Sequence, residues 1–515
     1  MKKSQSNMLF FIAALMLVSL CILFPLFKSG FIVTDDGDWM IIRLTAFYQA
    51  LADGQFPVRF LGRLNNNYGY PVANFLYPGF FYIGSILRLF KMSYPSIIEF
   101  ILGGSVCLSV VFLFLWLRKF FSNTASFIGA CSFLVSPYFL YDLYKRGSVG
   151  EIFGTACVII LLWSIESGFV WLIPPITALF LLSHNTLSLL FTLFLIGYIS
   201  IRKKWKSIVP LFIGACITSF FWLPAFFERS FVRFDAVQVA NPFDFKEVSQ
   251  TLLFMSLPFL VPLIYLFNKK KDFLRKEYVF FSVTIGIASI MTSVLGVFFW
   301  KSFFFTRFIQ FPYRMLAIFF IAGPWLLAFF LSKVEKGKMI FVGLLFLIIF
   351  FLVNIPLFRS IKSVVREEGF YTTNEGTTTV QDEYMPRWVK EQSDVRAYDK
   401  LVLFSGKGNI IIVKSSTKNI EAQLHLFEES IVQFNTVFYP GWGGMLDGKP
   451  VELSYENQKG LIQVTIPKGE HIISFEFRET AFRYIADIIS SIGIILYGIY
   501  IIRYLMSGVK RKVNV

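Results

Sequence analysis

The chain has 515 residues, of which 56% are hydrophobic and 16% charged, and its formal net charge is +16. Soluble globular proteins carry about 25% charged residues, so this composition excludes that class and indicates an integral membrane protein. The basic residues form short clusters between apolar runs, where the positive-inside rule places them, and this argues against nucleic-acid binding. The five cysteines show no CxxC spacing and indicate neither a disulfide nor a metal site.

The N-terminus joins Lys2 and Lys3 to an apolar run of about 20 residues without a small-residue cleavage site. This pattern predicts a retained signal-anchor helix with a cytoplasmic N-terminus, so residues 34–67 lie outside. Residues 38–52 have the amphipathic pattern of a helix on the membrane surface. The Tyr-rich residues 69–90, interrupted by prolines, are interpreted as an interfacial or re-entrant helix.

Further apolar runs, each long enough to cross a hydrocarbon core of about 30 Å, follow along the chain. The predicted spans after the N-terminal one are 96–117, 124–141, 150–166, 168–182, 185–201, 208–226, 250–267, 278–298, 314–332, 339–357 and 482–504. About twelve transmembrane helices result, with both termini cytoplasmic and the basic loops inside a bacterial plasma membrane. We expect residues 1–357 to form the helical core, with an outer catalytic loop at 28–95, and residues 481–515 to form the last span and a basic tail.

Residues 358–480 have a different character, because polar and apolar residues alternate there. The runs KLVLFSGKGNIIIVKSS, SIVQFNTVFY, PVELSYENQ, LIQVTIP and HIISFEF predict strands, with turns at 447–450 and 467–470. The predicted fold class is therefore an all-α polytopic membrane protein with a small extracytoplasmic β-sandwich domain. The role of this domain is left open between a lid or spacer and contact with carbohydrate.

Three carboxylates, Asp35, Asp36 and Asp38, follow the first span in the stretch TDDGDWMIIR. Inverting glycosyl transfer needs a carboxylate that takes the proton of the acceptor hydroxyl, and Asp36 is our candidate base with Asp35 as its partner. Both also offer oxygen ligands for Mg²⁺ or Mn²⁺, so a divalent cation is the one cofactor considered. The alternative is a solvated cluster that stabilises a helix N-terminus.

Arginines predicted on the same face are suited to bidentate phosphate binding. The candidates for the donor phosphate are Arg43, Arg146, Arg307 and Arg314. For each of them an interfacial anchor is the alternative. Arg43 projects from the apolar side of its helix, so it has to snorkel, pair with an aspartate of its loop or meet a lipid phosphate.

Four further residues are candidates for substrate contact. They are Asp38, Tyr70, Glu151 and His184. Glu151 follows Arg146 closely in YDLYKRGSVGE, so it either pairs with that arginine or meets substrate. His184 in LLSHNTLS is either a satisfied interfacial histidine or a hydrogen-bond partner of substrate.

Nucleotide-binding motifs are missing from the sequence. It contains no Walker loop, no GxGxxG motif opening a βαβ unit and no GxSxG motif. This absence disfavours nucleotide-driven chemistry and favours a lipid-linked donor at the outer face.

Several blocks resemble, in the same order, those of the bacterial integral membrane proteins labelled pyruvoyl-tetrahydropterin-synthase-related. The blocks are DDGDWMIIRLTAFYQALADGQFPVR, NYGYPVANFLYP, KRGSVGEIFG, SHNTLSLLF, FIQFPYRML, DEYMPRWV and FYPGWGGMLDGKPV. The resemblance spans nearly the whole chain. It implies a GT-C-type architecture with an acidic first outer loop and sugar transfer from a polyprenyl-phosphate donor, and it implies no pterin chemistry.

Functional positions carry over from this resemblance residue by residue. They fall on Asp36, Arg146, Gly147, Glu151, His184, Phe311, Pro312 and Arg314. Several relatives have a histidine where this chain has Met40. This departure puts in doubt any metal site that uses that histidine, with Asp38 as the residue that would compensate.

These observations predict an inverting membrane glycosyltransferase that takes its sugar from a polyprenyl-phosphate-linked donor. The expected acceptor is a cell-envelope glycan or cell-wall polymer, and membrane lipid surrounds the helices. Two rivals remain: a transporter or flippase for a lipid-linked glycan, and a non-catalytic envelope-assembly protein. Internal repeats and ionisable residues at the bilayer midplane would favour the transporter.

Overall fold

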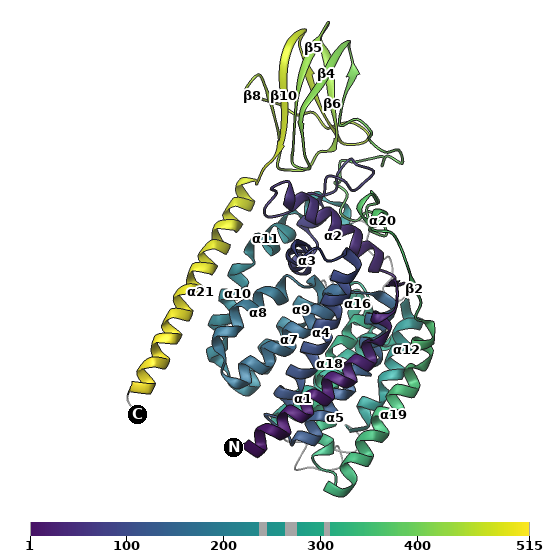
Figure 1. The fold of residues 1–515 in the computed structure, drawn as a ribbon, viewed down its shortest axis with the longest axis vertical. Helices are drawn as coiled ribbons and strands as arrows, with labels where there is room; N and C mark the ends of the chain where they lie inside the picture. Colours follow the sequence, from purple (N-terminus) through teal and green to yellow (C-terminus); the bar gives the residue numbers. More distant parts are fainter. Residues whose placement is uncertain (1, 236–244, 263–274, 303–308, 514–515) are drawn as a thin grey trace.

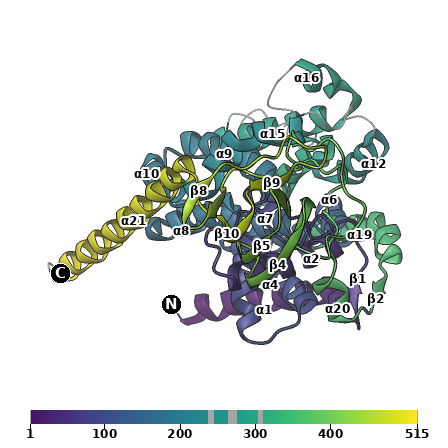
Figure 2. The same ribbon diagram turned by 90° about the horizontal axis from the view of Figure 1, so that it is seen from above.

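The computed structural model describes residues 2–235, 245–262, 275–302 and 309–513. Its α-helices are α1 (Lys2–Leu23), α2 (Gly37–Ala52), α3 (Gly79–Leu89), α4 (Tyr94–Leu117), α5 (Asn123–Leu134), α6 (Pro137–Tyr141), α7 (Val149–Ser167), α8 (Ile173–Leu181), α9 (Asn185–Arg202), α10 (Ile208–Ile217), α11 (Ser219–Phe227), α12 (Lys246–Ser256), α15 (Lys276–Thr292), α16 (Val297–Ser302), α18 (Phe319–Leu331), α19 (Lys336–Ser360), α20 (Glu368–Thr372) and α21 (Ala481–Val513). Most of them form one bundle, and a β-rich region stands at one end of it above α2 and α20 (Figure 1). Seen from above, α21 extends away from the bundle at one side (Figure 2).

The helical part is that of a polytopic membrane protein. Within the described residues, seven helices are long and apolar enough to cross a membrane, and up to ten spans result if each of three bent helix pairs is one span. The seven are Met8–Phe27, Tyr94–Leu117, Val149–Ser167, Asn185–Arg202, Pro312–Leu331, Lys336–Ser360 and Ala481–Met506. Each of these corresponds to a span predicted from hydrophobicity.

The remaining predicted spans show why twelve is too high a count for the described residues. The predictions at 124–141, 208–226 and 278–298 are helix pairs bent by 40°, 69° and 86°. The prediction at 168–182 is wrong, because only Val170–Leu181 is helical there. Twelve helical residues extend about 18 Å, which is less than the thickness of a hydrocarbon core. The prediction at 250–267 ends outside the described residues.

The β-rich region contains two antiparallel sheets, as the alternating pattern predicts. Their strands are β3 (Leu401–Ser405), β4 (Gly408–Ser415), β5 (Asn419–Leu426), β6 (Ser430–Val437), β7 (Trp442–Leu446), β8 (Lys449–Val451), β9 (Leu461–Ile466) and β10 (Gly469–Phe477). One sheet has the order β4-β5-β10-β7-β8 and the other β3-β6-β9. Side chains of both sheets share one buried apolar cluster, which includes Leu424, Phe434, Ile462 and Phe475. The sequence analysis missed β5 and β7, since β5 carries charged residues and β7 is rich in glycine.

A connecting segment, residues 361–400, runs from α19 to β3 across the first loop, and we call it the strap. It begins by pairing β2 (Ser363–Val364) with β1 (Phe31–Ile32) in antiparallel register. Further along, the backbone N–H of Ala397 donates to Asn66 O at 3.0 Å. The strap covers α2, and this helix buries ten of its residues. Its apolar side therefore packs against protein, and a position of α2 at the membrane surface stays a prediction.

A buried ionic cluster around Glu228 ties the β-rich region to the bundle. Arg483, at the start of α21, donates from Nε and Nη2 to the two oxygens of Glu228, both at 2.8 Å. The Asn74 amide and the Tyr439 hydroxyl donate to Glu228 Oε2 at 2.8 and 2.9 Å. This Glu228 cluster (Asn74, Glu228, Tyr439 and Arg483) joins the first loop, the turn after α11, the β-rich region and α21.

Candidate functional site

The first-loop aspartates lie against the segment that contains Arg146. The backbone N–H groups of Asp35 and Asp36 donate to Lys145 O at 2.9 Å and Arg146 O at 2.8 Å. On the surface, Lys145 Nζ lies 2.9 Å from Asp35 Oδ1. Two motifs more than a hundred residues apart in the sequence therefore form one site.

Gly147 permits this close approach. It follows a π-helical turn, Asp142–Arg146, and has the left-handed φ of +69°. A Cβ atom at Gly147 would lie 2.1 Å from Thr34 Oγ1, which accepts a hydrogen bond from Gly37 N at 3.0 Å. Since any other residue would push the aspartate loop away, glycine after Arg146 is a steric requirement of the site.

Below the loop, several charged side chains converge on one oxygen of Glu151, a residue with no exposed surface. Glu151 Oε1 lies 2.7 Å from Arg146 Nη1 and 3.1 Å from Arg314 Nε. The Tyr138 hydroxyl donates to Glu151 Oε2 at 2.7 Å. Arg146 Nη1 also lies 2.6 Å from the buried Asp142. We call Tyr138, Asp142, Arg146, Glu151, His184 and Arg314 the Glu151 cluster.

Both arginines of the Glu151 cluster keep hydrogen-bonding capacity. Arg146 uses Nη1 alone. Arg314 donates from Nε to Glu151 and from Nη1 to Ile309 O, Gln310 Oε1 and Thr186 Oγ1. Among the described residues, neither Nη2 group has a partner, and neither is one of the polar atoms sealed from solvent. Two guanidinium groups are thus held in place by a carboxylate and still have N–H donors for an anion.

His184 caps α9 and faces the Glu151 cluster in its neutral form. Its Nδ1 accepts from the backbone N–H of Leu187 at 3.3 Å, so the ring proton belongs on Nε2, which lies 3.5 Å from Glu151 Oε1. Burial lowers the pKa of His184 from its ordinary 6.5 to about 3, although the charge of Glu151 opposes this shift. Tyr77 lies against the imidazole, with ring centroids 4.7 Å apart.

The three first-loop carboxylates differ in what they contact. Asp38 is held by the strap, with Arg366 Nη2 at 3.0 Å and the Tyr371 hydroxyl at 3.2 Å. Asp35 pairs with Lys145, as described above. The Asp36 carboxylate, at the N-cap position of α2, has no hydrogen-bond or ion-pair partner within the described ranges. Burial and the nearby charge of Asp36 raise the pKa of Tyr77. The backbone hydrogen bond to Arg146 O holds Asp36 next to the segment that carries this arginine.

Other candidates from the sequence serve the strap or lie elsewhere. Arg43 donates from Nε to Thr378 Oγ1 at 2.9 Å and from Nη2 to Thr378 O, so it neither snorkels nor meets an aspartate. The Tyr70 hydroxyl bonds Thr379 Oγ1 at 3.1 Å and accepts from Tyr384 N at 3.0 Å. Arg307 lies outside the described residues.

A divalent cation stays a prediction. The part of the chain that the structure describes contains no group of three or more His, Cys, Asp or Glu side chains placed to hold a metal. Asp35 and Asp36 are two carboxylates, and Mg²⁺ bound by one or two carboxylates draws its remaining ligands from water and substrate phosphate. The two aspartates fit such a site only together with substrate.

Sequence reasoning missed Tyr77, Tyr138 and Asp142. Asp142 lies four residues before Arg146, which is the spacing of an ion pair on a helix and could have been noticed. The two tyrosines stand in aromatic-rich apolar segments, where nothing in the pattern separates a site residue from a packing residue.

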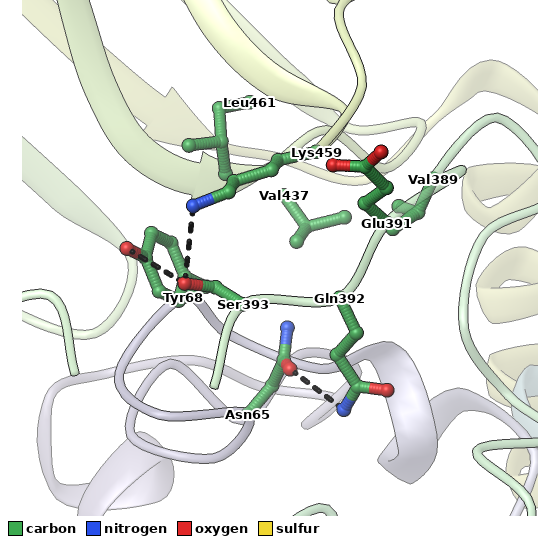
Figure 3. A pocket seen from close by; sticks show the side chains of 9 residues that line it. All are labelled: Asn65, Tyr68, Val389, Glu391, Gln392, Ser393, Val437, Lys459 and Leu461. Atoms are coloured by element: carbon green, nitrogen blue, oxygen red, sulfur yellow. Dashed lines mark hydrogen bonds between the residues drawn. The ribbon is translucent and has the colours of Figure 1, made fainter. Parts of the chain in front are cut away.

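A small cavity lies away from this site, between the first loop, the strap and the β-rich region (Figure 3). Its volume of about 10 Å³ has room for one water molecule at most. Lys459 Nζ donates to Ser393 Oγ at 3.3 Å and Gln392 Nε2 to Asn65 Oδ1 at 3.3 Å across it (Figure 3). The cavity marks where the three parts join and does not hold a substrate.

No protein-family model and no curated protein sequence matches the chain. Similar solved structures include ArnT from Cupriavidus metallidurans in the apo state, 14% identical over 72% of this chain and 68% of ArnT, with a TM-score of 0.44. The same ArnT bound to undecaprenyl phosphate is 14% identical over 70% and 67%, with a TM-score of 0.42. The Archaeoglobus fulgidus oligosaccharyltransferase with Zn and sulfate is 14% identical over 71% and 53%, with a TM-score of 0.40. The likeness is distant, so the function is argued from this chain's own residues.

Proposed function

We propose that this chain is a membrane glycosyltransferase that moves a sugar, with inversion, from a polyprenyl-phosphate donor to a glycan or polymer of the cell envelope. The observation that carries the proposal is the arrangement of Arg146 and Arg314. Both are held by Glu151 with Nη2 groups left for an anion, and the aspartate loop that carries the unpaired Asp36 lies against the same segment. This reaction requires a group that binds the departing phosphate and a group that accepts a proton.

In the proposed reaction, Asp36 takes the proton of an acceptor hydroxyl while that oxygen attacks C1 of the donor sugar. The new C1–O bond forms opposite the bond to phosphate, which breaks with its electron pair and leaves polyprenyl phosphate. Arg146 and Arg314 hold the phosphate and stabilise the charge that develops on it. Glu151 does not react, and its role is to hold both guanidinium groups so that less entropy is lost on binding.

The basic residues and the aspartate loop support an extracytoplasmic site in a plasma membrane, in line with the positive-inside pattern of the loops. The same reasoning places the β-rich region outside the cell. A polyprenyl-phosphate donor fits a site of this kind, because its sugar headgroup stays at the membrane surface while its lipid remains in the bilayer.

The deciding experiment supplies purified full-length protein with a radiolabelled polyprenyl-phosphate sugar and an envelope glycan fraction, and measures released polyprenyl phosphate. Asp36→Asn is expected to abolish release while thermal stability stays close to wild type, since the Asp36 carboxylate has no partner among the residues that the structure describes. Glu335→Gln is the matched control for the loss of a carboxylate, and it should retain activity because Glu335 forms an exposed pair with Lys338 and is not part of the candidate site. Full release by Asp36→Asn would refute the assignment of the base.

Wild-type protein that leaves the donor intact but moves it across the membrane of reconstituted vesicles would instead establish the transporter.

Undecaprenyl phosphate, the ligand of the ArnT structure, is a practical probe of phosphate binding by the two arginines. Arg314→Lys should weaken its binding, because lysine keeps the charge beside Glu151 but loses the second N–H donor.

A further inference from the structure

Three aromatic side chains gather where the strap meets the β-rich region. Phe438 and Tyr455 are stacked, with ring centroids 3.9 Å apart and an interplanar angle of 6°. The Trp388 ring lies 5.8 Å from Phe438 and 5.7 Å from Tyr455. The three residues come from the strap, the end of β6 and the turn between β8 and β9. Only the tertiary structure assembles them, and we call them the aromatic platform.

The aromatic platform lies at the edge of the buried apolar cluster of the two sheets, against which Trp388 and Phe438 pack. Interior aromatic side chains such as Phe434 and Phe475 are 4% and 0% exposed, whereas all three platform residues are partly exposed. The indole N–H of Trp388 donates to Phe438 O at 3.0 Å, which fixes the position of that ring. Within the described residues, the Tyr455 hydroxyl has no hydrogen-bond partner. The rings are thus held rigidly at a surface, with one polar group unused.

Charged and polar residues of both signs lie close in the sequence to the platform residues. Glu456 and Gln458 are exposed beside Tyr455, and Glu391 and Lys459 are exposed at the rim of the adjoining small cavity (Figure 3). Mixed charge does not suit an anionic lipid surface or a nucleic acid, which need a basic cluster. A sugar ring offers an apolar C–H face to an aromatic ring and hydroxyl groups to polar neighbours, and this combination matches the surroundings observed.

The strap connects the aromatic platform to the first loop. Tyr384 lies four residues before Trp388, a chain length of at most about 14 Å. Its ring stacks on Phe75, with centroids 5.4 Å apart, and on Phe234 at 5.7 Å. Its backbone N–H donates to the Tyr70 hydroxyl at 3.0 Å, and Arg366 of the same strap lies 3.0 Å from Asp38. The strap therefore leads from the platform to the loop that carries the aspartates.

We propose that the aromatic platform of Trp388, Phe438 and Tyr455 binds the glycan chain of the acceptor, through stacking on Tyr455 and hydrogen bonds to its polar neighbours. The inference rests on the proposed function and adds the substrate class to it: an extended glycan, held outside the reacting centre. Binding at a second point raises the local concentration of the acceptor hydroxyl, and this lowers KM without changing the chemical step.

The test uses purified full-length protein and insoluble bacterial cell-wall sacculi as the glycan probe, with co-sedimentation as the measurement. Tyr455→Ala is expected to weaken binding about tenfold, whereas Tyr455→Phe, which keeps the ring, should lose much less. Tyr398→Ala is the matched control, because Tyr398 is a tyrosine of the same strap that is 79% exposed and not part of the platform. Wild-type protein that does not sediment with sacculi, or equal binding by Tyr455→Ala, overturns the proposal.

A kinetic measurement separates this proposal from the function on which it rests. With a polymeric acceptor, Tyr455→Ala should raise KM about tenfold and leave kcat unchanged, whereas a structural defect would lower kcat as well. If no variant and no wild-type protein releases polyprenyl phosphate but sedimentation still depends on Tyr455, the transferase assignment fails and the glycan site stands. If release occurs and sedimentation is independent of Tyr455, the glycan site fails alone.

Discussion

The Glu228 cluster and the Glu151 cluster are both buried ion pairs of arginine and glutamate, but they are built in opposite ways. In the Glu228 cluster a single guanidinium meets both oxygens of its carboxylate, and Asn74 and Tyr439 add two further donors. In the Glu151 cluster two guanidinium groups and a histidine share one oxygen. In the first cluster both oxygens of the carboxylate are saturated with donors, and in the second one carboxylate oxygen holds two guanidinium groups.

The difference shows how a buried ion pair can serve anchoring or binding. The leftover Nη1 of Arg483 is sealed inside the protein, so it serves no ligand. The leftover Nη2 groups of Arg146 and Arg314 are not sealed. Burying charges costs free energy in either case, and such pairs contribute little net stability. The ion pairs of the Glu151 cluster hold N–H donors in place for an anion. The ion pair of the Glu228 cluster orients α21 and the β-rich region.

Removing the shared carboxylate should have the largest effect. Glu151→Gln removes the carboxylate that pairs with Arg314 and leaves Arg146 with Asp142 alone. Because buried charge is then uncompensated, the free energy of unfolding should fall by about 3 to 5 kcal/mol and transfer should cease. Thermal unfolding in detergent and release of polyprenyl phosphate measure the two effects. A variant with wild-type stability would show that the arginines do not depend on Glu151.

The same substitution made in both clusters tests the comparison directly. Arg314→Lys keeps the charge beside Glu151 and loses a donor to the leaving group, so kcat should fall about hundredfold with a small change in Tm. Arg483→Lys loses bidentate pairing with Glu228, so Tm should fall while kcat at low temperature stays close to wild type. If both variants changed the same quantity, the two clusters would not differ in role.

An acid-dependent loss of stability should come from the Glu151 cluster. The pKa of His184 is lowered to about 3, so from pH 6.5 downward the unfolded chain binds a proton that the folded chain does not. Stability from this residue is complete above pH 6.5 and is lost as the pH falls toward 3. His184→Asn keeps a capping side chain for α9 and should make Tm less dependent on pH between about pH 7 and about pH 4. An unchanged pH profile would show that another group controls it.

The smallest effect is expected for the exposed pair above the Glu151 cluster. Lys145 and Asp35 are 53% and 51% exposed, so Lys145→Ala should change the free energy of unfolding by at most about 1 kcal/mol. Added salt should reduce even this difference, because exposed charges are screened. A larger loss, measured by unfolding at low and high salt, would mean that Lys145 holds the aspartate loop in place.

Part of this organisation is readable from the sequence. Hydrophobic run length predicts the long helices, because the thickness of the hydrocarbon core sets it. Alternation predicts the two-sheet region, because one face of each strand is buried. The stretch TDDGDWMIIR and the residues Arg146, Glu151, His184 and Arg314 are candidates from their chemistry alone. The structure brings the last four together, although no sequence pattern predicts that Arg146, His184 and Arg314 approach the same oxygen of Glu151.

Only the tertiary structure decides which charged side chains already have hydrogen-bond or ion-pair partners within the protein. Arg43 and Arg146 are equivalent candidates in the sequence, yet Arg43 is bound to Thr378, more than three hundred residues away. Asp36 and Asp38 stand two residues apart, and contact with Arg366 in the strap separates their roles. Sequence determines which groups are available for phosphate and proton transfer, because that follows from residue type. Long-range contacts decide which of them remain free, because a hydrogen-bonding group can be satisfied by any part of the chain that folds against it.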